Sequence, residues 1–248
     1  MSYFKSVTES FVSTFSLKLS KNKQKESEKL IAKGVKSCVA IGLLSAGKCS
    51  YPEAIVMSTI IGWFNDIGIY SYTEKPMSVC FSARTNNGYH LLIYPQYRLA
   101  KPKYLNNQGR NQQDYWFVDL AIEFLVYDKE DCESVIIGIW GLEYDGHPIH
   151  FVEGGIKSSQ TRDLVIDTEY GISLKHIHKE LWSENENLVK ANLHAFIYRL
   201  YTSTALLPFE ALRNKKVNLE KLPTLDLIES SDGVFRATHW LNNEDFMN

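Results

Sequence analysis

Apolar side chains recur at helical spacing near the start of the chain. In residues 1–20 they fall three or four positions apart, at Phe4, Val7, Phe11, Phe15 and Leu19, which is typical of an amphipathic helix. Residues 21–29 are mostly charged or polar, so we expect a solvated helix face or a linker there. Residues 27–46 are largely apolar and predict one buried helix that ends at Gly47.

The next segment begins with a helix-start signal. Ser50 suits an N-cap position, Pro52 suits the first turn, and Glu53 stands three positions after Ser50. This pattern predicts a helix that runs to about Phe64. After a short loop we expect strands near 78–83 and 89–99, and then a polar loop over 100–114.

Period-two alternation is clearest between Trp116 and Val126. One face of this expected strand is apolar and the other is mixed, with Val118, Leu120, Ile122 and Phe124 against Asp119, Ala121 and Glu123. Residues 135–144 are apolar almost throughout, which favours a central strand.

The rest of the pattern predicts a helix over 157–170 closed by Gly171, a strand over 172–177 and a mostly helical segment over 178–207. From residue 208 the chain is polar and rich in turns. The alternation of elements predicts an α/β fold with a mixed sheet.

Composition narrows the classes of protein. The 248 residues are 44% hydrophobic with a formal net charge of −2, so binding to nucleic acid would depend on a local patch rather than on bulk charge. Four scattered cysteines and the lack of a visible signal peptide lead us to expect a reduced, cytoplasmic protein. The longest apolar run, 38–46, is too short to span a membrane, so we expect no membrane contact.

Two carboxylates close the apolar strand at 135–144. Glu143 and Asp145 occupy alternate positions of one strand and therefore point to the same face, about 7 Å apart. Such a pair is repulsive unless a cation lies between the two groups, which is the arrangement of a hard-metal site. His147 and His150 follow and could act as a general acid or base, as metal ligands or as phosphate donors; surface residence is the alternative.

Other polar residues admit two readings. Asp119 either belongs to a buried site or is solvated on an edge strand, and Glu53 is either a helix cap or a catalytic group, with capping the better reading of Glu53 taken alone. Arg162 could reach a phosphate or form a salt bridge with Asp163 or Glu169. For His176, His178 and Lys179, which end a predicted strand, we favour surface positions over contacts with a nucleic-acid backbone.

Seven motifs stand in a recognisable order between residues 50 and 182. They are Ser50-Tyr-Pro-Glu53, Pro95-Gln96, Val118-Asp119, Glu143-Tyr-Asp-Gly-His147 with His150, Arg162-Asp163, Gly171-Ile172 and Glu180-Leu-Trp182. Together they resemble the PD-(D/E)XK endonuclease superfamily, in its branch of very-short-patch-repair (Vsr-like) endonucleases. No single motif is specific, and the resemblance rests on their order and spacing.

The resemblance implies a restriction-endonuclease-like mixed sheet flanked by helices over 49–207, with a helical extension over 1–48 and a further extension over 208–248. It implies Mg²⁺ or Mn²⁺ bound by Glu53, Asp119 and Glu143, and hydrolysis of DNA phosphodiesters by metal-activated water. The implied catalytic residues are Asp119, Glu143, Asp145, His147 and His150, and the implied contacts to nucleic acid are Gln96, Lys157 and Arg162. Asp145 stands where most of the superfamily has lysine, so another group must take over the role of that lysine, and His147 or His150 is our candidate.

Three functional hypotheses follow. The first is a metal-dependent DNA endonuclease in restriction, repair or defence against foreign DNA. The second is an inactive nuclease fold that binds nucleic acid or protein partners, which the five tryptophans and the unmatched flanks favour. The third is a plain scaffold with a solvated acidic strand. Cutting both strands of a duplex would favour a homodimer, for which the N-terminal helix is the expected contact.

Overall fold

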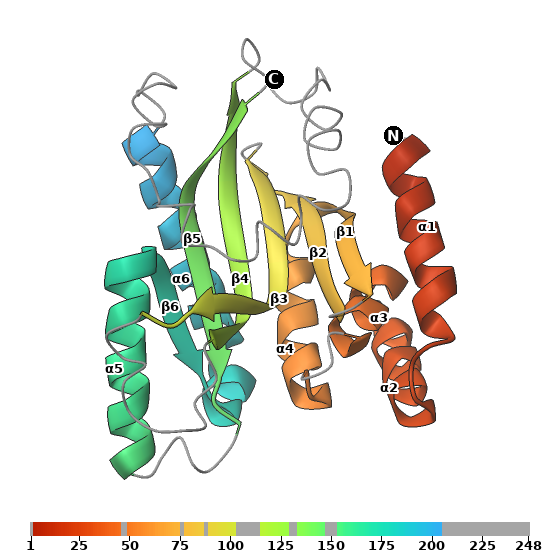
Figure 1. The fold of residues 1–248 in the computed structure, drawn as a ribbon, viewed down its shortest axis with the longest axis horizontal. Helices are drawn as coiled ribbons and strands as arrows, with labels where there is room; N and C mark the ends of the chain where they lie inside the picture. Colours follow the sequence, from red (N-terminus) through yellow and green to blue (C-terminus); the bar gives the residue numbers. More distant parts are fainter. Residues whose placement is uncertain are drawn as a thin grey trace.

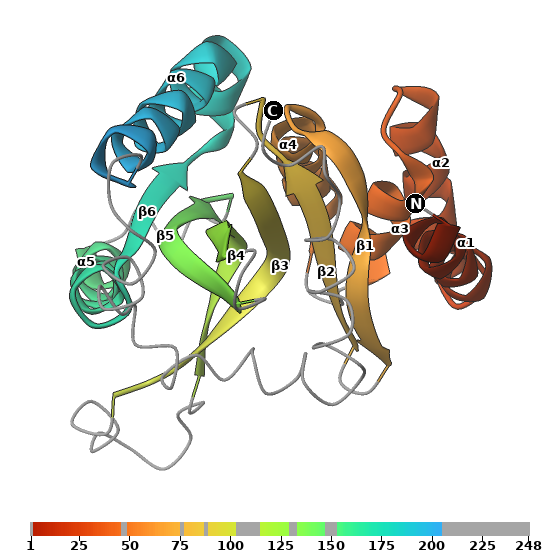
Figure 2. The ribbon, with the colours of Figure 1, turned by 90° about the horizontal axis from the view of Figure 1, so that it is seen from above.

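A six-stranded mixed β-sheet with helices on both faces forms the centre of the protein (Figures 1 and 2). The computed structural model describes residues 2–45, 49–74, 77–86, 89–102, 115–128, 133–146 and 153–204. The strands are arranged in the sheet in their chain order. The predicted α/β class and the mixed sheet flanked by helices are therefore confirmed at this level.

Five strands form an antiparallel meander, and the sixth is added in parallel. The meander consists of β1 (Asn65–Glu74), β2 (Met77–Arg84), β3 (His90–Ala100), β4 (Tyr115–Asp128) and β5 (Glu133–Tyr144). Helix α5 (Glu153–Tyr170) then leads to β6 (Ile172–Ile177), which pairs with β5 in parallel. Because β5 and β6 are parallel neighbours, this crossover brings their C-terminal ends together at the same end of the sheet.

The remaining helices cover the other face and the β1 side of the sheet. They are α1 (Ser2–Ser16), α2 (Lys21–Ala32), α3 (Ser37–Ser45), α4 (Tyr51–Gly62) and α6 (Lys179–Thr204). Figure 2 shows α4 and α6 on one side of the sheet, α5 on the opposite side, and α1–α3 beside β1.

Two apolar clusters, one on each face of the sheet, form the core. The larger cluster joins α1–α4 and α6 to the sheet, and the smaller one joins α5 to the opposite face. Along β4, Leu120, Ile122 and Phe124 belong to the larger cluster and Ala121 belongs to the smaller one. Because Phe11 and Phe15 of α1 share the larger cluster, the first helices pack directly on the sheet. The predicted boundary at residue 48 stays a prediction.

Two predictions about the elements are wrong. The segment 27–46 is not one helix, because α2 ends at Ala32 and α3 begins at Ser37, with Gly34 at φ +91° between them. Glycine adopts this left-handed backbone conformation readily, whereas other residues rarely do, and the conformation ends a helix. The expected loop after residue 64 contains strand β1, whose residues pair with β2 over most of its length.

The helix start at Ser50 is confirmed in detail. The Ser50 hydroxyl accepts from the Glu53 backbone N–H, and Glu53 Oε2 accepts from the Ser50 backbone N–H at 2.5 Å, which completes a capping box.

The solvated edge-strand reading of β4 is wrong. β4 lies between β3 and β5, whereas β1 and β6 are the edges of the sheet. Glu123 is 1% exposed, and burial raises its pKa to about 7 even though the Tyr97 hydroxyl donates to it at 2.9 Å. The polar face of this strand is therefore inside the protein.

Among the described residues, no helix combines the length and the apolar content needed to cross a membrane.

Candidate active site at the ends of β4 and β5

Asp119 lies where the pairing of β4 with β5 stops. The ladder between these strands reaches Leu120 and Leu142 and does not continue to the next pair. In its place the Asp119 side chain acts as acceptor, because Oδ2 lies 2.8 Å from the Tyr144 backbone N–H. A carboxylate thus occupies the gap that opens between the two strands.

Gln96 holds the second oxygen of the same carboxylate. Its Nε2 donates to Asp119 Oδ1 at 3.1 Å, and its backbone has φ +56° between the pairs that β3 makes with β4 on either side. A positive φ is uncommon for a residue other than glycine and often marks a functional position. The structure therefore places the Gln96 side chain against Asp119. A contact of Gln96 with nucleic acid stays a prediction.

Glu143 is the most deeply buried acid of this site. It is 6% exposed, and burial together with the nearby Asp119 charge raises its pKa to about 8. Arg162 on α5 forms an ion pair with it, with Nη2 3.3 Å from Oε1. Oε1, the oxygen in this ion pair, is buried and makes no well-aligned hydrogen bond with the described residues.

A histidine bridges two aspartates beside Glu143. His176 is the β6 residue paired with Glu143, its Nδ1 lies 2.8 Å from Asp145 Oδ2, and its Nε2 lies 2.8 Å from Asp163 Oδ2. Only the imidazolium carries a proton on both ring nitrogens, and the contacts with Asp145 and Asp163 raise the pKa of His176 to about 10. Asp145 is therefore paired with a cation.

Glu53 lies near the cluster but turns its carboxylate to the helix end. Its charge contributes to the raised pKa of Asp119, for which burial is the first cause, and to that of Tyr144. The capping box nevertheless uses Glu53 Oε2. Within the described ranges, no three His, Cys, Asp or Glu side chains form a ready metal site. Of the three predicted metal ligands, Asp119 and Glu143 come together and Glu53 is engaged elsewhere.

Several predicted residues cannot be placed. His147 and His150 lie outside the described residues, and so does the side chain of Lys157, whose backbone belongs to α5.

Arg162 approaches Glu143 and also Asp163, with Nη2 3.5 Å from Asp163 Oδ1. Its predicted salt bridge with Asp163 is therefore present, together with one that the sequence analysis did not foresee.

The sequence analysis missed the central position of His176, which we expected at the surface. The side chain is 31% exposed and sits between two carboxylates. Its partners come from the segment after β5 and from α5, and only the parallel pairing of β6 with β5 brings them together. A histidine near the end of a predicted strand, following a Glu-x-Asp motif, was the available signal.

No family model, no curated protein and no solved structure matches this chain.

Proposed function

We propose that this protein is a metal-dependent endonuclease that hydrolyses DNA phosphodiester bonds on a restriction-endonuclease-like sheet. The observation that carries the proposal is the meeting of Asp119 and Glu143 where β4 and β5 stop pairing. The order of elements supports it as well, because α4, β3, β4, β5, α5, β6 and α6 carry the seven motifs of the resemblance in sequence.

The two carboxylates fit a divalent metal ion. Burial is the first cause of the raised pKa of both groups; the charge of Glu53 adds to the rise for Asp119, and the charge of Asp119 adds to the rise for Glu143. A bound cation would therefore relieve the cost of ionising them. Glu143 Oε1 is buried, and its contact in this structure is the ion pair with Arg162 at 3.3 Å, which a metal ion would replace. Oxygen is the ligand atom that Mg²⁺ and Mn²⁺ prefer. When bound, the ion would polarise the phosphodiester and lower the pKa of a water ligand.

The residues around the carboxylates have separate roles in this proposal. Gln96 and the Tyr144 N–H orient Asp119. Arg162 contacts Glu143 in the absence of metal and is the candidate to bind a substrate phosphate once the ion is present. His147 and His150 remain candidates for proton transfer, and Asp145 keeps His176 in place.

Cleavage assays on supercoiled plasmid and on a labelled single strand test the proposal. Wild-type protein should cut with Mg²⁺ or Mn²⁺ and not with EDTA, and Glu143→Gln should lose at least about a hundredfold in rate. Glu123→Gln is the matched control, since Glu123 is also a buried β-sheet glutamate with a raised pKa but hydrogen-bonds to Tyr97. It should cut at close to the wild-type rate.

Cutting by Glu143→Gln at the wild-type rate, with normal folding, would overturn the assignment. Comparison of the two substrates shows whether one strand or both are cut.

A second candidate function is a metal-free binding module with the same fold. The Arg162 ion pair with Glu143 and the Tyr144 N–H on Asp119 favour it, because both acids already have partners without a metal. This candidate predicts that wild-type protein binds DNA or a protein partner equally well in EDTA. Binding that requires Mn²⁺ argues against it.

A further inference from the structure

Helix α6 is apolar on two opposite sides. Val189, Leu193 and Ile197 point into the core. Leu188, Ala191, Ala195 and Tyr198 lie on the outer side, and we call these four residues the outer stripe. Leu188 is 60% exposed and Tyr198 is 67% exposed, and both alanines are exposed as well.

Exposed apolar residues are concentrated on this helix. Among the described residues, six large hydrophobic side chains are exposed, and three of them, Leu188, Tyr198 and Tyr201, belong to α6. Scattered exposed leucines need no explanation, whereas a contiguous row of apolar residues marks a contact surface. The outer stripe has the 3-4-3 spacing of the seam between two packed helices.

We propose that the outer stripe is the interface of a symmetric homodimer in which two α6 helices pack antiparallel. The stripe is self-complementary about Leu193. Leu188 and Tyr198 each lie five residues from Leu193, and Ala191 and Ala195 each lie two residues from it. When two α6 helices pack antiparallel with their Leu193 positions at the two-fold axis, Leu188 of one copy faces Tyr198 of the other. Ala191 of one copy likewise faces Ala195 of the other, and these small side chains allow the two helices to approach closely near the axis.

Charge favours the antiparallel direction. The exposed acids Glu184 and Glu186 precede the outer stripe, and the exposed Arg199 stands at its other end. Antiparallel packing brings the acids of each copy toward Arg199 of the other, whereas parallel packing would place like charges together.

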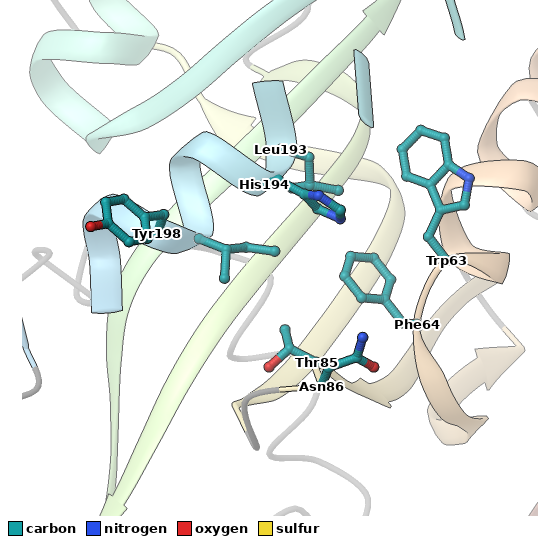
Figure 3. A pocket seen from close by; sticks show the side chains of 8 residues that line it. Trp63, Phe64, Thr85, Asn86, Leu193, His194 and Tyr198 are labelled. Carbon is teal, nitrogen blue, oxygen red and sulfur yellow. The ribbon is translucent and has the colours of Figure 1, made fainter. Parts of the chain in front are cut away.

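A pocket beside the outer stripe offers space for an anchor residue. It has a volume of about 340 Å³ and opens between α4 and α6, where Trp63 and Phe64 lie across from His194 (Figure 3). Tyr198 lines the pocket on the α6 side. In the antiparallel arrangement, Leu188 of the second copy lies opposite Tyr198 and therefore next to this pocket. Burial of an apolar anchor in such a pocket is typical of the residues that dominate an interface.

Light scattering of the full-length protein over a range of concentrations tests the dimer. Wild-type protein should show the mass of two chains, and Leu188→Glu should raise the dissociation constant at least about tenfold. Leu17→Glu is the matched control, because Leu17 is a leucine of 83% exposure outside the outer stripe, and it should leave the dimer intact. A monomer at all concentrations, or a dimer that Leu188→Glu does not weaken, overturns the proposal.

Cross-linking tests the direction of packing. A mixture of Ala191→Cys and Ala195→Cys chains, treated with a short bis-maleimide, should give more cross-linked dimer than either variant alone, because position 191 of one copy faces position 195 of the other. Stronger linking within each single variant than in the mixture would overturn the antiparallel arrangement.

Discussion

The carboxylate of Glu143 ends an apolar strand and is almost completely enclosed by the fold. Its pKa of about 8 means that the folded protein holds a proton which the unfolded chain, with a usual glutamate pKa, has released above pH 4.5. Stability contributed by this group is therefore fully present below pH 4.5 and is lost progressively between pH 4.5 and pH 8.

The substitution Glu143→Gln removes this loss. In EDTA, we expect the variant to gain on the order of 1 kcal/mol of unfolding free energy over wild type at pH 8 and to show no gain near pH 4.5. Urea unfolding across this pH range measures the difference. A gain that is equal at both pH values would contradict the assigned cause.

His176 has the opposite kind of charge and a different pH window. Its pKa of about 10 lies above its ordinary value of 6.5 because it hydrogen-bonds to Asp145 and forms an ion pair with Asp163. Its stabilising contribution is fully present below pH 6.5 and is lost as the pH rises through 10.

We expect His176→Ala to lower the unfolding free energy by about 1–2 kcal/mol near pH 6 and by much less at pH 10, because it leaves two neighbouring aspartates without their cation. Thermal or urea unfolding at both pH values provides the measurement. His194→Ala, at an exposed position on α6 outside this cluster, is the control and should have little effect at either pH.

At the scale of elements, helix α3 depends on a glycine for its contact with the sheet. A Cβ added at Gly42 would lie 2.6 Å from Phe81 Cζ, and Phe81 is fully buried on β2. A Cβ at Gly62, the last residue of α4, would meet nothing within 4 Å.

The two glycines should therefore respond in opposite ways to alanine. Gly42→Ala should destabilise by about 1–3 kcal/mol through overpacking, and Gly62→Ala should stabilise by a few tenths to about 1 kcal/mol through the lower entropy of the unfolded chain. Chemical unfolding of both variants measures this, and a stabilising Gly42→Ala would show that α3 can move away from β2.

Local sequence signals located most of the elements. The Ser50 cap and the glycine after α5 act through contacts within a few residues, so their predictions hold. The alternation along β4 holds from Leu120 to Phe124 but is wrong for Val118, which belongs to the smaller cluster on the opposite face. Strand β1 was missed because it begins with Asn65 and Asp66, and Asp66 has φ +52°. Pairing with β2, rather than local preference, makes that segment a strand.

At the scale of the whole molecule, metal binding should be coupled to stability. A ligand that binds only the folded state stabilises it by mass action, by about 2.7 kcal/mol at a concentration 100 times its Kd. We expect Mn²⁺ to raise the melting temperature of wild-type protein, and to do so more at pH 8 than at pH 6, because Glu143 must lose its proton to bind the ion.

Thermal melts with Mn²⁺ and with EDTA at both pH values measure this coupling. Asp119→Asn should abolish the shift, whereas Glu123→Gln should retain it. An equal shift in wild type and in Asp119→Asn would place the bound ion elsewhere in the protein.

The sequence by itself determined the class of the fold, most helices and strands, and the positions of Asp119 within one strand and of Glu143 near the end of the next, because periodicity and capping are local properties. Only the tertiary structure decided which side chains meet. The Tyr144 N–H on Asp119, the Arg162 pair with Glu143 and the bridge through His176 join elements separated by as many as 31 residues. Such contacts depend on strand register and on the parallel crossover through α5, which are set by the packing of the whole core rather than by any local pattern.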